Sequence, residues 1–170
     1  SDLVFFVLAA SGCSREASPT APPPPQSLTI GVPESNVTGV ASGLRGVSQL
    51  VSVEGLTVPN TDGRVLPRLA ESWAWQPDGR ALVLALRPNV TFHDGTALTP
   101  EVAAKILKDV IARPGNIAQY PAVTDITDVA PRGSREVVIS VSRRSSFLPE
   151  DLELPLTLAN NVGTGAYRIV

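Results

Sequence analysis

Hydrophobic and polar residues follow one another in short, distinct patterns through the middle of the chain. Residues 72–76 (SWAWQ) place Trp73 and Trp75 on one face of a predicted strand. The apolar run at residues 81–86 predicts the strand that pairs with it. The intervening Pro-Asp-Gly is typical of a turn, because proline presets φ, aspartate bonds the backbone and glycine takes φ > 0 without steric cost. The pattern therefore predicts a β-hairpin.

A helical period follows a second predicted turn at residues 91–95 (TFHDG). Thr99 is in the position of an N-cap, with Pro100 at the first helical position. Glu101 lies in the first turn, where the helix dipole favours an anion. Apolar residues then recur three and four positions apart, which predicts a buried stripe; its members are Val102, Ala103, Ile106, Leu107, Val110 and Ile111. The helix is predicted to end at residues 113–115 (RPG).

The flanking regions carry weaker patterns. The other predicted elements are strands at residues 28–32, 125–130, 136–141 and 154–158, a helix at residues 43–53 and a helical turn at residues 147–152. Gly46 weakens the helix at residues 43–53 by roughly 1 kcal/mol relative to alanine. Residues 116–120 give no defined pattern. The elements together predict a mixed α/β (α+β) fold.

The start of the chain differs from the rest in composition. Residues 3–10 (LVFFVLAA) have the length of a signal-peptide hydrophobic region and are too short to span a bilayer as a helix. Small residues and Cys13 follow, a pattern similar to the bacterial lipobox, so residues 1–13 are interpreted as ending at a lipidated cysteine. The alternative is a buried strand that ends in an inert cysteine. Residues 14–26 are rich in proline, which predicts a stiff tether that reaches on the order of 40 Å.

Length and charge narrow the possible functions. The chain has 170 residues, a formal net charge of -2 and 43% hydrophobic residues, which is enough to bury one ordinary core. No basic stripe interleaves with aromatic residues, so nucleic acid is not expected as a partner. The chain contains one cysteine and therefore cannot form an internal disulfide.

Candidate catalytic and metal-binding residues do not converge in the sequence. His93 is the only histidine, whereas a metal site requires several ligands; we interpret it as a turn residue that bonds local backbone. Asp94, Glu101 and Asp109 are spread over a turn and a helix, without the pairing that a carboxylate hydrolase requires. The two tryptophans are in a predicted core strand, which favours packing over ligand stacking. We therefore expect no enzymatic activity, no metal and no cofactor.

Several short motifs occur in a fixed order through the centre of the chain. They are Pro67, Leu69-Ala70-Glu71-Ser72-Trp73, Asp78-Gly79, Leu86-Arg87, Val90, Phe92-His93-Asp94-Gly95 and Leu98-Thr99. In this order they resemble the extracytoplasmic solute-binding proteins of ABC transporters, in the peptide/nickel type known as family 5. Each motif alone is weak, but the ordered set is specific. Flanking matches at Glu54-Gly55-Leu56 and at residues 163–167 (GTGAY) extend the resemblance along most of the chain.

The resemblance implies a fold similar to type II periplasmic binding proteins, with only the N-terminal part of the two lobes present. It assigns residues 27–42 to the first strand and cleft loop of lobe I, and residues 43–158 to a small accessory lobe. Residues 159–170 are then the crossover back to lobe I. Two glycines around a threonine in GTGAY suit a segment that bends and packs close to other backbone. We therefore expect an N-terminal fragment or a truncated gene product.

The loop after the first predicted strand supplies the candidate substrate-binding residues Glu34, Ser35 and Asn36. Ligands of open α/β sheets gather beyond the carboxyl ends of strands, and the resemblance places this loop at the cleft between the lobes. A solvated turn with a local side-chain hydrogen bond explains the same residues equally well.

The resemblance also implies a function: capture of short peptides, or similar small solutes, for import by an ABC permease through hinged closure of two lobes. We expect a monomer in the periplasm or at the outer face of the cytoplasmic membrane, held there by its lipid anchor. Peptide, nickel chelate, haem and oligosaccharide binders share these motifs, so the ligand stays open. Two alternatives remain: a lipid-anchored interaction or sensor module that no longer serves transport, and an extracytoplasmic hydrolase.

Overall fold

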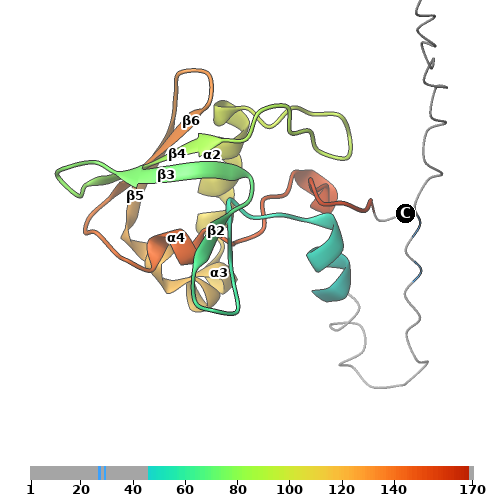
Figure 1. The fold of residues 1–170 in the computed structure, drawn as a ribbon, viewed down its shortest axis with the longest axis horizontal. Helices are drawn as coiled ribbons and strands as arrows, with labels where there is room; N and C mark the ends of the chain where they lie inside the picture. The colour runs from blue at the N-terminus through green and yellow to red at the C-terminus, as the bar shows by residue number, and fades with distance from the viewer. Residues whose placement is uncertain (1–26, 28, 30–45, 169–170) are drawn as a thin grey trace, which may run out of the picture.

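An antiparallel sheet with one long helix against it forms the centre of the structure (Figure 1). The computed structural model describes residues 27, 29 and 46–168. The sheet consists of β3 (Ala70–Trp75), β4 (Ala81–Leu86), β6 (Glu136–Val141) and β5 (Ile126–Arg132), hydrogen-bonded in that order. All neighbouring strands are antiparallel. The mixed α/β class predicted from the sequence is confirmed.

The predicted hairpin forms as β3 and β4. Trp73 pairs with Leu84 and Trp75 with Leu82, and both tryptophans lie half-buried against the core. In the turn, Gly79 has φ +68°, and the Arg80 amide donates to Asp78 Oδ1 at 3.0 Å. Strand β3 begins two residues earlier than predicted, at Ala70, which pairs with Leu86; a bulge between Ala70 and Ser72 shifts the register of the pairing there.

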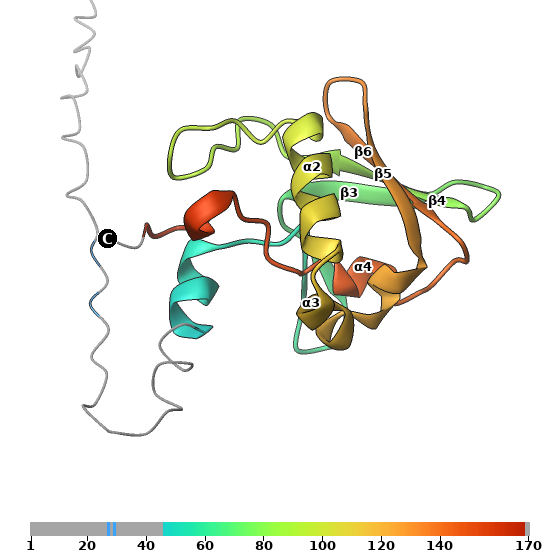
Figure 2. The same cartoon turned by 180° about the vertical axis from the view of Figure 1, so that it is seen from behind.

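The predicted helix is α2 (Pro100–Ile111). The Thr99 hydroxyl accepts a hydrogen bond from the Val102 amide at 3.3 Å, so the predicted N-cap is confirmed. The helix packs against β5 and β6, on the face of the sheet that Figure 2 turns toward the reader. Most of the predicted stripe is buried there, namely Ala103, Ile106, Leu107 and Val110, with Val102 and Ile111 half-buried at its margin.

Strands β5 and β6 confirm the second predicted pair, with a shorter loop between them. Pro131 was expected in the loop but belongs to β5, where it is opposite Val137. Strand β5 lies at an edge of the sheet, and an edge strand tolerates proline because its outer side has no ladder hydrogen bond to lose.

Four small elements that precede β5 in the chain were not predicted. Strands β1 (Thr57–Pro59) and β2 (Val65–Pro67) form a separate two-stranded ribbon. The helix α3 (Pro114–Gln119) begins shortly after α2, and most of it covers residues that show no defined pattern of apolar positions. A 3-10 turn, η1 (Pro121–Asp125), then leads into β5. These segments are short, and each owes its shape to neighbouring structure rather than to a sequence period.

The C-terminal part contains one confirmed element and one that was wrong. The predicted helical turn is α4 (Leu148–Asp151). The predicted strand at residues 154–158 does not form; Leu156 makes only an isolated bridge with Glu54. Leu154 and Leu156 are nevertheless fully buried. Their alternation reflects burial in an irregular segment, followed by the 3-10 turn η2 (Ala159–Asn161).

The core gathers leucines from both halves of the described chain. Its largest fully buried side chains are Leu56, Leu69, Leu82, Leu84, Leu86, Leu107, Val110, Ile139, Leu148, Leu152, Leu154 and Leu156.

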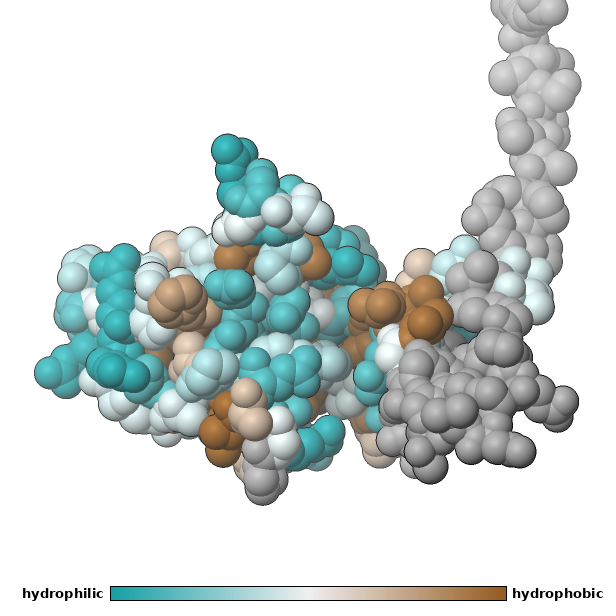
Figure 3. All heavy atoms as spheres, turned by 90° about the horizontal axis from the view of Figure 1, so that it is seen from below, coloured by the Kyte–Doolittle hydropathy of each residue, from teal (hydrophilic) through white to brown (hydrophobic). Residues whose placement is uncertain are grey.

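Seen from below, the surface is mostly hydrophilic with small, separate hydrophobic patches (Figure 3). No helix among the described residues is long and apolar enough to cross a membrane. The described part of the predicted helix at residues 43–53 is helical at residues 46–52, and the predicted strand at residues 28–32 lies outside the continuous described range.

Candidate functional site at the chain junction

The incoming and outgoing parts of the chain meet at one place, which we call the junction and define as residues 51–54, His93 and residues 163–167. The Gly165 amide donates to Ser52 O at 2.9 Å, and the Tyr167 amide donates to Val51 O at 3.1 Å. The His93 amide donates to Gly163 O at 2.9 Å. In Figure 1 the last described segment accordingly lies beside the helical residues 46–52. The sheet is therefore connected to the flanking segments at a single end.

Two glycines make this close approach of backbones possible. A Cβ atom on Gly165 would lie 2.5 Å from Ser52 C and 2.6 Å from Val51 O. A Cβ atom on Gly163 would overlap Ser52 O. Any other residue at either position would push the two segments apart. The expectation that GTGAY packs close to other backbone is confirmed.

His93 joins the same junction through its side chain. Its Nε2 lies 2.8 Å from Gly165 O, which is 72 residues away in the sequence. The prediction that it bonds backbone is confirmed, but the prediction that this backbone is local is wrong. The turn places the imidazole over the outgoing segment, so the histidine links two distant parts of the chain. Among the described residues, no three His, Cys, Asp or Glu side chains are grouped closely enough to hold a metal ion.

Glu54 is the central polar side chain of the junction. Arg68 Nε donates to its Oε1 at 2.8 Å, and Thr164 Oγ1 donates to its Oε2 at 3.0 Å. The carboxylate is only 15% exposed, so both contacts form in a partly desolvated place, where they are stronger than on an open surface. Sequence reasoning noted the Glu-Gly-Leu and Gly-Thr-Gly motifs but did not pair them. The glycines present in both motifs were the one available sign that the two segments approach each other closely.

A groove with a volume of about 440 Å³ opens beside the junction. Leu50, Glu54, Arg68, Tyr120 and Glu153 are among the residues that line it. Burial, and then the nearby carboxylates Glu150 and Asp151, raise the pKa of Glu153 above its usual value. Burial also raises the pKa of Tyr120, with a further contribution from neighbouring carboxylates. The groove therefore combines an apolar wall, where Leu50 is 78% exposed, with hydrogen-bond acceptors.

The predicted cleft residues Glu34, Ser35 and Asn36 lie outside the described residues, as does the predicted lipid anchor Cys13. They stay predictions. Of the described residues that were considered for their chemistry, His93 is in the junction.

The sequence model for bacterial extracellular solute-binding proteins, family 5 Middle, matches residues 64–170. The chain belongs to this family. It is also 30% identical over 110 residues to the nickel-binding periplasmic protein of Escherichia coli strain K12. That alignment covers 64% of this chain and 21% of the relative, so the chain spans about a fifth of the length of this curated protein. The family predicted from the ordered motifs is confirmed.

Solved structures of the family have the same fold over the matched region. NikA from Brucella suis in complex with Fe(III)-EDTA has a TM-score of 0.63 at 25% identity, covering 72% of this chain and 28% of that one. NikZ from Campylobacter jejuni in complex with Ni(L-His) has a TM-score of 0.62 at 23% identity, and the match covers 71% of this chain and 27% of NikZ. OppA from Haemophilus influenzae, in complex with RPPGFSPFR, has a TM-score of 0.53 at 18% identity, and the match covers 73% of this chain and 31% of OppA. These neighbours are type II periplasmic binding proteins, as expected from the sequence.

Proposed function

We propose that this protein captures a short peptide, or a similar small solute, outside the cytoplasmic membrane for import by an ABC transporter. The observation that carries the proposal is the family match over residues 64–170. The family consists of extracellular solute-binding proteins, and OppA from Haemophilus influenzae holds a peptide in its solved structure. A metal complex is the second candidate, because the 30% identical relative is a nickel-binding periplasmic protein.

The geometry of the junction supports a hinged mechanism. The chain reaches the sheet and leaves it through segments that are hydrogen-bonded side by side. Two adjacent crossings confine a lobe to rotation about one place, which is how hinged domains close around a ligand. We accordingly assign residues 43–158 to a small accessory lobe and residues 159–170 to the crossover. Residues 27–42 are assigned to lobe I, with Glu34, Ser35 and Asn36 facing the cleft.

The location of the protein is the second part of the proposal. Residues 1–13 are proposed to act as a signal segment that ends at Cys13, the site of lipidation. Residues 14–26 would then hold the folded part at a distance on the order of 40 Å from the membrane. Mass spectrometry of the protein from its native host tests this directly: a diacylglycerol on Cys13 is expected, and an unmodified thiol there would contradict the anchor.

Solute capture is tested on the product of the whole gene, purified from its host. Denaturation followed by mass spectrometry should release one class of small solute, and calorimetry should show one-to-one binding of short peptides or of Ni(L-His). If neither class binds, the proposal is wrong. If a solute binds but deletion of the permease leaves its uptake unchanged, the sensor alternative is favoured.

Two variants locate the site within that protein. Glu34→Gln is expected to weaken solute binding, whereas Glu101→Gln, an exposed change of the same kind in α2, should leave it unaltered. Equal affinities for both variants would remove Glu34 from the site without affecting the proposed function. The 170-residue chain alone is expected to bind no peptide at micromolar concentration, because it spans only about a quarter of the solved neighbours.

A further inference from the structure

We propose that the far end of the sheet carries a binding site for a phosphate group, in a hollow between the β3–β4 turn and the segment after β6. The hollow has a volume of about 350 Å³. Three arginines line it, Arg80, Arg143 and Arg144. Figure 1 shows the β3–β4 turn at the opposite end of the molecule from the helical residues 46–52. The site is therefore separate from the junction.

Sheet topology brings these arginines together. Strands β4 and β6 are neighbours, and the first residue of β4, Ala81, pairs with Ser140 near the end of β6. The Val141 amide donates to Arg80 O at 2.9 Å, which fixes the two segments to each other at the mouth of the hollow. The ladder thus brings the turn before β4 and the segment after β6 side by side, and the three arginines lie on these two segments.

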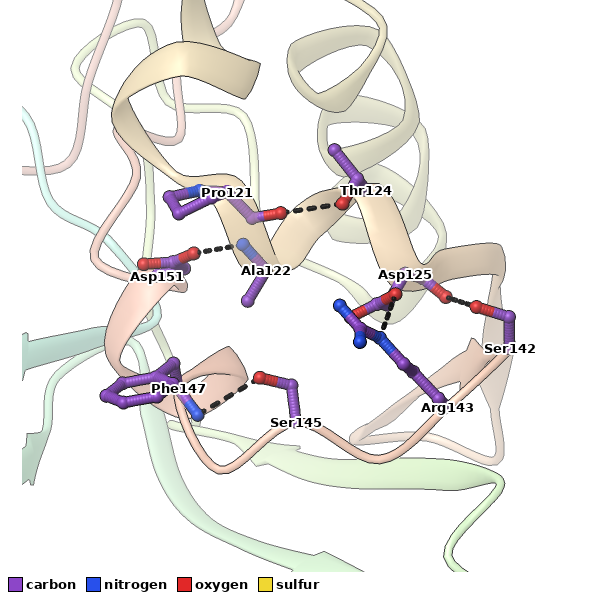
Figure 4. A network of polar contacts seen from close by, with 9 residues as sticks. All are labelled: Pro121, Ala122, Thr124, Asp125, Ser142, Arg143, Ser145, Phe147 and Asp151. Carbon is purple, nitrogen blue, oxygen red and sulfur yellow. Dashed lines mark hydrogen bonds and ion pairs between the residues drawn. The ribbon is translucent and has the colours of Figure 1, made fainter.

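Arg143 is held from one side only. Its Nε donates to both carboxylate oxygens of Asp125, at 2.9 and 3.0 Å. Figure 4 shows the Arg143 side chain turned toward Asp125. Asp125 is 8% exposed, while the side chain of Arg143 is 79% exposed. The terminal N–H groups of Arg143 have no partner in the described part of the chain. The ion pair therefore orients the guanidinium and leaves its outer N–H groups available.

Arg144 is positioned by packing. Its guanidinium carbon lies 5.3 Å from the centroid of the Trp75 ring, and its Cδ lies 3.6 Å from where a Cβ on Gly79 would be. A cation over an aromatic face keeps its charge and its in-plane N–H donors. Arg80 is exposed, and no carboxylate of the described residues lies within ion-pair distance of either Arg80 or Arg144. Two of the three guanidinium charges are therefore uncompensated.

One carboxylate opposes the site. Asp78 also lines the hollow, and its Oδ1 accepts the Arg80 amide hydrogen bond. The hollow nevertheless contains more cations than anions. Guanidinium groups bind phosphate oxygens through paired N–H donors, with more specificity than a point charge provides. A phosphate monoester or diester suits the hollow because its several oxygens can accept from more than one arginine at once.

The phosphate group can come from solution or from a phospholipid headgroup, and two arms of one experiment separate these sources. The 170-residue protein is titrated with inorganic phosphate and with glycerol phosphate, followed by calorimetry. Separately, it is sedimented with phosphatidylcholine vesicles that do or do not contain phosphatidylglycerol. Saturable binding in the first arm indicates a soluble phosphate. Binding only to the vesicles with phosphatidylglycerol indicates the lipid. No binding in either arm overturns the proposal.

Matched variants test the assignment to these residues. The double variant Arg80→Gln/Arg144→Gln is expected to bind at least about tenfold more weakly, because each lost guanidinium removes a charge-assisted hydrogen bond. Arg87→Gln removes the same charge just after the other end of β4 and should leave affinity unchanged. Asp78→Asn should strengthen binding, because it removes the opposing charge and keeps an acceptor for the Arg80 amide. An equal loss for Arg87→Gln, or no gain for Asp78→Asn, would overturn the site. Arg143 is left intact because it neutralises Asp125.

Discussion

The sheet and the junction are held together by different kinds of interaction. The sheet and α2 meet through side chains with almost no exposed surface, such as Leu84, Leu107 and Ile139. The junction is held by main-chain hydrogen bonds and by the hydrogen bonds that the Glu54 carboxylate accepts from Arg68 and Thr164. Its segments can approach this closely because Gly163 and Gly165 have no side chain. The first region depends on the volume of its side chains, and the second depends on two positions having none.

The two kinds of interaction differ in strength. Complete burial of one leucine contributes about 1.5–3 kcal/mol, whereas one intramolecular hydrogen bond contributes a net of about 0.5–1.5 kcal/mol. The sheet buries many such side chains, while the junction has a handful of hydrogen bonds. We therefore expect the junction to open locally before the sheet unfolds. A hinge needs this order of events, because the lobe must stay intact as it moves.

The largest effect is expected from a cavity in the sheet region. Leu107→Ala should lower the free energy of unfolding by about 2–5 kcal/mol, because it removes a fully buried side chain between α2 and the sheet. Urea denaturation followed by circular dichroism measures the change. Lys105→Ala, an exposed truncation in the same helix, should change stability by less than about 0.5 kcal/mol. Similar losses for both variants would contradict the packing of α2.

An intermediate effect, confined to the junction, is expected from Gly165→Ala. The new Cβ would collide with the backbone of Val51 and Ser52, so the segments must separate, at a cost of about 1–3 kcal/mol. Hydrogen exchange should show faster exchange at the Gly165 and Tyr167 amides and unchanged protection in β4 and β6. Gly115→Ala is the control, because nothing lies within 4 Å of the added Cβ. If protection of β4 fell as well, the two regions would not be separable.

The smallest effect concerns the groove beside the junction. A pKa that is raised on folding means that the protonated form of Glu153 is favoured in the folded state. Its contribution to stability is therefore fully present below the usual value of 4.5 and is lost as pH rises through the folded pKa. Glu153→Gln should thus be more stable than the parent at pH 7, and the difference should vanish at low pH. Thermal unfolding across this pH range measures it.

Asp128→Asn is the matched control, because the pKa of Asp128 is shifted in the opposite direction. The hydrogen bond from Lys108, at 2.9 Å, lowers the pKa of Asp128, so its contribution to stability is present at neutral pH and lost as pH falls. The variant should be slightly less stable than the parent at pH 7 and equal to it in acid. If both variants changed stability at pH 7 in the same direction, the opposite pKa shifts of Glu153 and Asp128 would be contradicted.

The parts of the fold that the sequence predicted are those governed by neighbours along the chain. The Pro-Asp-Gly turn, the Thr99 cap and the stripe through Leu107 each follow from residues within four positions of one another. The failures occur where local rules lack information. Strand β2 has three residues and pairs only with β1. Residues 154–158 alternate as a strand does, but only the bridge between Leu156 and Glu54 pairs this segment with another.

The sequence by itself determined the hairpin, the capped helix and the family, because turn chemistry, helical period and an ordered set of motifs are all visible along one dimension. Only the tertiary structure decided the junction. Glu54 meets Thr164 across 110 residues and His93 meets Gly165 across 72, and no local preference encodes such distances. The two glycines marked a close approach, but only the folded chain shows that Ser52 is the residue they approach.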